Sequence, residues 1–236
     1  KKNISTEMNS TGFGIPENIK KLKNLDFLKI SLDGPEQIND LIRCAGGYKI
    51  AIQAAESARK NDLNFIFTCT LTKFNIKQET IEHLLRIAEY FNTQVAFQPL
   101  KELYRGVSDI SHLNPDQEEF RKALDLLIIT KRKTGSLLRN SLIGLYHIYH
   151  WPDYKKLNCW AGKIFCMIDT AGILFPCDRI FYKDKLPNCL ELGFNKAFSS
   201  LPIVSCAGCG FCGVLELNFL MAFRISTLQS ILKVIK

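Results

Sequence analysis

Cysteine is the residue type whose number and spacing in this chain point most clearly to chemistry. The chain has nine cysteines in 236 residues, and seven of them fall between residues 159 and 212. These seven are Cys159, Cys166, Cys177, Cys189, Cys206, Cys209 and Cys212. Glycines lie among the last three, and glycine lets a backbone wrap closely around bound sulfur or metal. Clustered cysteines without a secretory signal favour a metal or iron–sulfur site over a set of disulfides.

A β-hairpin is predicted in the first part of this stretch. Residues 163–168 and 173–176 are strand-like segments on either side of the turn sequence Asp-Thr-Ala-Gly. Cys159 precedes the first strand and Cys177 follows the second. The hairpin should therefore bring these two cysteines side by side at its open end.

The remaining cysteines leave the kind of metal site open. Cys206, Cys209 and Cys212 can fold back to complete a site of four thiolates, which suits structural zinc or an iron–sulfur cluster. Zinc sites usually pair two knuckles of closely spaced cysteines, and only one arm has such spacing here, which favours iron–sulfur. Cys166 lies within a predicted strand and is interpreted as a small core residue. Cys189 stays an ambiguous ligand.

Composition limits the partners and the compartment. The formal charge of +8, from 31 basic and 23 acidic residues, suits an anionic substrate or cofactor. The basic residues are scattered and do not form the stripe typical of a nucleic-acid surface, so we expect no nucleic-acid partner. The sequence has no apolar run of about twenty residues that could cross a membrane. The odd number of cysteines argues against a disulfide scaffold, and we expect a cytoplasmic location.

Strands and helices are expected to alternate over the first hundred residues. Strands are predicted at 4–8, 27–32, 65–71 and 94–99, and helices from Pro16, over 47–60 and over 80–91. This alternation predicts an α/β fold with a parallel sheet, flat or rolled into a barrel, with ligands at the carboxyl ends of the strands.

The second half of the chain departs from this alternation. Helices are predicted over 116–133 and 136–150, and a short amphipathic helix over 223–235. Trp151-Pro152 interrupts the helical pattern. We therefore expect one domain over residues 1–150 and a second, cysteine-rich domain over residues 151–236.

Several segments resemble the radical S-adenosylmethionine (radical SAM) enzymes. Residues 30–35 (Ile-Ser-Leu-Asp-Gly-Pro), followed by residues 39–43 and 46–48, are similar to the fourth-strand region of that family. Met8-Asn9-Ser10 stands where the family often has Thr-Asn-Gly, and residues 97–100 resemble the end of the sixth strand. Cys159, Gly172 and Cys177 are spaced as in SPASM and twitch extensions, which bind auxiliary 4Fe–4S clusters.

The resemblance implies a fold, a reaction and a set of partners. The fold would be a partial (β/α)6 TIM-like barrel, with strands three to six in this chain, followed by the small auxiliary-cluster domain. The reaction would be reductive cleavage of SAM to a 5′-deoxyadenosyl radical that abstracts a substrate hydrogen. Implied partners are a small-molecule or peptide substrate and a reductant such as ferredoxin or flavodoxin.

The resemblance also assigns residues to the cofactors. The implied SAM-binding residues are Asn9, Ser31, Asp33, Arg43 and Gln98. The implied ligands of the auxiliary 4Fe–4S cluster are Cys159, Cys177, Cys206, Cys209 and Cys212. No catalytic residue is assigned.

The sequence departs from the family pattern in two respects. It lacks the C-x3-C-x2-C motif of the cluster that binds SAM, and it starts at Lys1 close to a predicted strand. We therefore expect a fragment of a radical SAM enzyme, or a degenerate relative, that does not cleave SAM by itself. The short cysteine tail fits one cluster, as in twitch extensions. The alternative is a non-catalytic scaffold module that binds iron–sulfur or zinc.

Overall fold

The structure is a computed structural model, which describes residues 4–100, 103–104, 108–177, 182, 185–204 and 208–222. It divides into two compact units. The first comprises Lys1–Pro99 and Pro115–Tyr149, and the second comprises Leu100–Asn114 and His150–Lys236.

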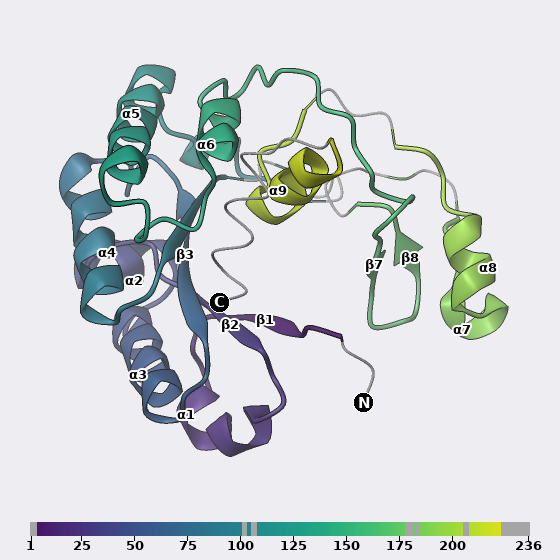
Figure 1. Ribbon diagram of the computed structural model, residues 1–236, viewed down its shortest axis with the longest axis horizontal. Coiled ribbons are helices and arrows are strands. Elements are labelled where there is room, and N and C mark those ends of the chain that lie inside the picture. The colour runs from purple at the N-terminus through teal and green to yellow at the C-terminus, as the bar shows by residue number, and fades with distance from the viewer. Residues whose placement is uncertain are drawn as a thin grey trace. The chain divides into compact units, whose positions relative to one another are not determined.

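A parallel sheet of four strands forms the centre of the first unit. The strands are β1 (Glu7–Ser10), β2 (Phe27–Ser31), β3 (Phe65–Leu71) and β4 (Val95–Pro99), in the order β1-β2-β3-β4 (Figure 1). The structure confirms the α/β class and the four parallel strands expected of the partial barrel. β3 is an inner strand whose first three residues are buried, and beyond them only Thr68 and Thr70 are half-exposed.

Helices α3 (Gly47–Lys60) and α4 (Gln78–Tyr90) pack against one face of this sheet. α1 (Ile15–Asn18), which is followed by a 3-10 turn at Ile19–Leu22, and α2 (Glu36–Ile42) pack on α3. α5 (Gln117–Thr134) packs on α4, and α6 (Leu142–Ile148) packs on α5. α3 and α4 run alongside the strands (Figure 1) and bury small and branched residues at helical spacing. β2 and β4 alternate buried and half-exposed residues, so their opposite face is only partly covered.

Helix α2 is absent from the sequence-based prediction. Its seven residues follow Asp33-Gly34-Pro35, directly beyond the predicted strand at 27–32. Pro35 stands at the N-cap in an extended conformation, where the missing N–H and the fixed φ of proline cost the helix nothing. A proline after a strand therefore starts a helix here, and that helix carries residues of the candidate site.

The predicted helix over 136–150 is wrong in its first half, because residues 137–140 lie along the outer edge of β4. Val95 N donates to Leu137 O at 2.9 Å, and Arg139 N donates to Val95 O at 3.0 Å. The Asn140 side chain continues this ladder: Oδ1 accepts from Phe97 N at 2.8 Å and Nδ2 donates to Phe97 O at 2.9 Å. These bonds to a strand outcompete the local helical pattern, and α6 starts only after Ser141, which caps it.

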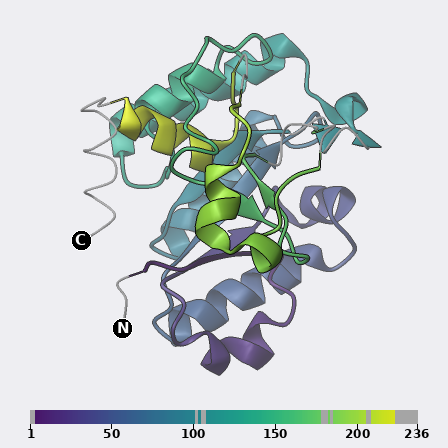
Figure 2. The same ribbon diagram turned by 90° about the vertical axis from the view of Figure 1, so that its right-hand side faces the viewer.

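The second unit is built from short elements. They are β5 (Leu103–Tyr104) paired antiparallel with β6 (Ser108–Asp109), a 3-10 turn at Ser111–Leu113, β7 (Met167–Ile168) paired antiparallel with β8 (Leu174–Phe175), α7 (Cys189–Leu192), α8 (Phe194–Ser199) and α9 (Cys212–Met221). α7 and α8 lie side by side (Figure 2). The hairpin is confirmed, with shorter strands than predicted, and Asp169 Oδ1 holds its turn by accepting from Ala171 N and Ile173 N at 2.9 Å each.

Two further observations complete the fold. The predicted helix over 223–235 lies outside the described residues. In the described part of the chain, no helix combines the length and the apolar character that a membrane span requires.

Candidate functional site

A polar row crosses the sheet on the face that the helices leave partly open. Asn9 pairs with Lys29, Ser31 with Thr68, and Thr70 with Gln98 in the parallel register. Residues two apart in a strand share a face, so all six belong to one surface: Asn9, Lys29, Ser31, Thr68, Thr70 and Gln98. The fold thus brings three predicted SAM-binding residues, Asn9, Ser31 and Gln98, to the same face.

Lys29 is a residue of this face that the sequence analysis does not identify. Its ammonium forms an ion pair with Glu7, two residues before Asn9 on β1. The alternation of the segment Phe-Leu-Lys-Ile-Ser-Leu already places Lys29 and Ser31 on one side of the strand. At the far end of the row, Gln98 Nε2 donates to Thr70 Oγ1 at 3.3 Å.

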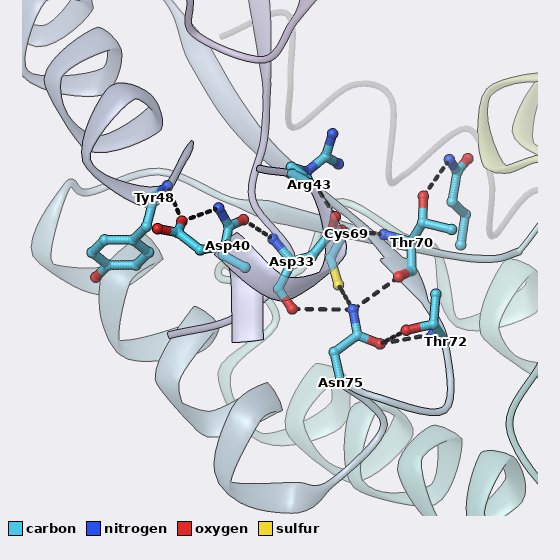
Figure 3. A network of polar contacts seen from close by, with 10 residues as sticks. Asp33, Asp40, Arg43, Tyr48, Cys69, Thr70, Thr72 and Asn75 are labelled. Atoms are coloured by element: carbon cyan, nitrogen blue, oxygen red, sulfur yellow. Dashed lines mark hydrogen bonds and ion pairs between the residues drawn. The ribbon is translucent and has the colours of Figure 1, made fainter. Parts of the chain in front are cut away.

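Asp33, just beyond the end of β2, is buried and fully engaged. Its side chain is 2% exposed, and Oδ2 lies 2.7 Å from Arg43 Nε in an ion pair. Oδ1 accepts a hydrogen bond from Thr70 N on β3 at 2.9 Å (Figure 3). Burial raises the pKa of the Asp33 carboxyl, while the Arg43 charge and the Thr70 N–H oppose that rise. Each carboxylate oxygen therefore has a partner within the protein, and one of these partners is the Arg43 guanidinium.

Arg43 is held so that its outer nitrogens remain available. It stands at the C-cap of α2, where its N–H donates to Asn39 O at 2.9 Å. Figure 3 shows the two outer guanidinium nitrogens extending away from Asp33. Within the described residues no hydrogen bond engages these two nitrogens, and the side chain is 25% exposed. A guanidinium presented in this way can bind a carboxylate with two parallel hydrogen bonds.

Asp40 holds the loop between α2 and α3, which follows Arg43, by accepting two backbone hydrogen bonds. Its oxygens accept from Gly46 N at 2.6 Å and from Tyr48 N at 2.8 Å, at the start of α3. The Tyr48 N–H is the main reason that the pKa of Asp40 is held below its ordinary value. Asn39 links Asp40 to Asp33, because its Nδ2 donates to Asp40 Oδ1 at 3.4 Å and its Oδ1 accepts from Asp33 N at 3.0 Å. Sequence reasoning identifies Arg43 and Asp33 but misses both supporting residues.

The two ends of the hairpin in the second unit lie close together. Gly162, at a φ of +76°, approaches Pro176 so closely that a Cβ would lie 3.3 Å from the proline Cβ. Gly162 follows Cys159 by three residues, and Pro176 directly precedes Cys177. This contact agrees with the expected approach of the two arms. Cys177 is buried, and its N–H donates to Tyr182 OH at 3.2 Å.

Asn218 connects the Cys159 arm to α9, the helix that begins at Cys212. It is fully buried. Its Oδ1 accepts from Trp160 N at 3.0 Å, and its Nδ2 lies 3.9 Å from Cys159 Sγ as a donor. Sequence reasoning gives no signal for this residue, because α9 itself is not predicted.

The cysteines do not form a preassembled metal site in the part of the chain that the structure describes. No three His, Cys, Asp or Glu side chains among those residues are grouped closely enough to hold a metal ion. Cys206 lies outside the described residues. Burial, with a smaller contribution from Cys189, raises the pKa of Cys166, which favours its neutral thiol.

No protein-family model matches this chain. The chain is 24% identical over 228 residues to the mycofactocin maturase MftC of Mycobacterium ulcerans, covering 89% of the chain and 60% of that protein. It is 25% identical over 180 residues to the protein of the same name in Mycolicibacterium smegmatis, covering 74% of the chain and 45% of that protein. The chain therefore spans less than two thirds of the length of these relatives.

Solved structures share the fold. One is anSMEcpe with bound AdoMet (S-adenosylmethionine), with a TM-score of 0.61 and 16% identity, covering 92% of the chain and 60% of that structure. Another is anSMEcpe with bound AdoMet and the Kp18Cys peptide, with a TM-score of 0.61 and 15% identity, covering 96% of the chain and 76% of that structure. Together with the motif at residues 30–48 and the spacing of the hairpin cysteines, the likeness to these maturases supports the resemblance to the radical SAM enzymes, and the solved structures show that the chain shares the anSMEcpe fold.

Proposed function

We propose that the protein to which this chain belongs binds SAM above the polar row and uses it to modify a peptide. The observation that carries the proposal is Arg43, which is fixed by a buried carboxylate and directs its outer nitrogens away from it. When bound to a 4Fe–4S cluster and reduced, SAM supplies a 5′-deoxyadenosyl radical that abstracts a hydrogen atom. Residues 1–150 would bind SAM and residues 151–236 would bind the auxiliary cluster.

The chain's own residues have separable tasks in this proposal. Arg43 would bind the SAM carboxylate, and Asp33 would keep the guanidinium oriented. Ser31, Asn9 and Gln98 would contact the remaining polar groups of SAM or of the substrate from the polar row. A positioned set of this kind favours the reaction because the reacting groups are held at fixed distances.

A peptide is the substrate class that the comparisons favour. The relatives bear the name maturase, and one similar structure contains a bound peptide beside AdoMet. The electron for SAM cleavage would come from a low-potential reductant such as ferredoxin or flavodoxin.

An auxiliary 4Fe–4S cluster is proposed at Cys159, Cys177, Cys206, Cys209 and Cys212. The support is the approach of Gly162 to Pro176 and the link that Asn218 makes between the two cysteine arms. About four irons with acid-labile sulfide are expected per chain for this site. Cys177→Ser should lose the visible absorbance, whereas Cys44→Ser, at an exposed cysteine of the first unit, should keep it. Zinc without sulfide would instead support the scaffold alternative.

The SAM site is tested in the intact natural protein after anaerobic reconstitution. Arg43→Gln should weaken SAM binding at least about tenfold, because a charge-assisted contact is lost. The matched control is Arg86→Gln, an exposed arginine of α4 paired with Glu82. Equal SAM affinity in both variants would remove Arg43 from the site. Reduced protein that forms no 5′-deoxyadenosine from SAM with any peptide would contradict the proposed reaction.

A further inference from the structure

The side chain of Asn75 joins the carboxyl ends of two neighbouring strands. Its Nδ2 donates to Asp33 O, just beyond β2, at 3.0 Å and to Thr70 O on β3 at 2.9 Å. The same nitrogen lies 3.5 Å from Cys69 Sγ. All three contacts are visible in Figure 3. One amide therefore ties β2 to β3 at the end where the candidate site lies.

The oxygen of the Asn75 amide is held by Thr72, three residues earlier in the same loop. Asn75 Oδ1 accepts from Thr72 N at 2.7 Å and from Thr72 Oγ1 at 3.2 Å. Asn75 is 0% exposed, so it contacts no ligand directly. Buried polar groups that are completely satisfied in this way rigidify the segments they join.

The residue that Asn75 holds is the residue that orients Arg43. The backbone of Asp33 is fixed from two directions, by Asn75 at its carbonyl and by Asn39 at its N–H. Its side chain then bridges Thr70 N and Arg43 Nε. The contacts form a continuous path from a buried amide to a half-buried guanidinium, over residues that are far apart in sequence.

We propose that Asn75 is a positioning residue that sets the direction of the Arg43 guanidinium through Asp33, and so the affinity of the protein for the carboxylate of SAM. The inference rests on the proposed function of Arg43. An asparagine suits this place because one side chain offers two donors to two carbonyls and an acceptor to the loop. An aspartate would point an acceptor at both carbonyls and would leave them unpaired.

The test compares a ligand that carries the carboxylate with a ligand that lacks it. S-adenosylmethionine carries the carboxylate, whereas 5′-methylthioadenosine has the same adenosine with a neutral thioether in place of the sulfonium, and it lacks the carboxylate and the amine. Dissociation constants for both are measured on the reconstituted natural protein, its Asn75→Asp variant and its Asn61→Asp variant. Asn61 caps α3 with a side-chain bond to Ser57 O and provides the same chemical change far from the site.

Asn75→Asp should weaken SAM binding about tenfold, which corresponds to a lost charge-assisted contact, and change methylthioadenosine binding less than about twofold. Asn61→Asp should change neither. Equal losses for both ligands, or an unchanged affinity for SAM, would overturn the inference. If Arg43→Gln itself leaves the ratio of the two affinities unchanged, the proposed function of Arg43 fails, and the role of Asn75 fails with it.

A second variant and a second measurement cover the case in which Asn75→Asp does not fold. Thr72→Val keeps the side-chain volume and removes the hydroxyl, which donates to Asn75 Oδ1 at 3.2 Å and accepts from Phe74 N at 3.3 Å. It should shift the affinity ratio in the same direction by about twofold to fivefold. In the protein without cofactor, hydrogen exchange of the Thr70 amide should be faster in this variant. An unchanged ratio and unchanged exchange would count against the positioning role.

Discussion

Arg43 Nε lies 2.7 Å from Asp33 Oδ2, in an ion pair whose two partners differ widely in exposure. The carboxylate is 2% exposed, and the guanidinium is 25% exposed. A charge buried to this extent is stabilised only while its partner and its N–H donor remain in place. The pair therefore couples the stability of the first unit to the geometry of the candidate site.

The first prediction concerns this coupling. Arg43→Gln should lower the free energy of unfolding by about 3 kcal/mol, because it leaves the Asp33 carboxylate buried and unpaired. The double variant Asp33→Asn with Arg43→Gln should recover most of that loss, since no buried charge then remains. Urea unfolding of the three proteins measures the effect. If the double variant is as unstable as Arg43→Gln, the cost does not come from an unpaired charge.

The second prediction uses the pH dependence of Asp40. Its pKa in the folded protein is lowered from an ordinary value of 3.8, chiefly by the Tyr48 N–H. Because the pKa is lower in the folded protein, Asp40 takes up its proton in the unfolded state at a higher pH than in the folded state. The stability that Asp40 contributes is therefore complete above about pH 3.8. It should be lost as the pH falls through the folded pKa.

Asp40→Asn provides the comparison for this prediction. The difference in unfolding free energy between the natural protein and Asp40→Asn should be largest at neutral pH and should shrink in acid. Asp62→Asn, at an exposed aspartate after α3, is the matched control for the loss of one surface carboxylate. A difference that grows as the pH falls would have the wrong sign for a lowered pKa.

The third prediction concerns Asn218 and the proposed auxiliary cluster. Asn218→Leu keeps the volume but removes the acceptor of Trp160 N and the contact to Cys159 Sγ. Residues that orient metal ligands commonly change metal affinity tenfold or more when replaced, so iron loss to a chelator should be about tenfold faster. Asn195→Leu, on the exposed side of α8, should lose iron at the natural rate. Equal rates in the two variants would show that Asn218 does not support the cluster.

The parts of the fold that depend on local pattern could be predicted from the sequence. Residues 47–60 and 65–71 form a helix and a strand with the predicted bounds. Their residues carry a clear helical period and a clear buried-strand composition. The hairpin between Cys159 and Cys177 was likewise predictable from its turn residues.

The parts that depend on distant contacts could not be predicted. Asn140 lies 43 residues from Phe97, and its side chain decides that residues 137–140 follow a strand and do not form a helix. Asp33 accepts from Thr70 N, 37 residues away, and the sequence gives no signal for that contact. Short helices such as α2 were missed because a proline both ends one element and begins another.

The pairing of Asn140 with β4 also governs which edge of the sheet can recruit another strand. Over residues 95–97 the outer backbone groups of β4 are occupied by residues 137–140, so that edge offers no template for strand addition. In the described residues no strand pairs with the outer side of β1. The sheet is thus closed to extension at β4, and any further strand, from the same protein or from another molecule, would have to join it at β1.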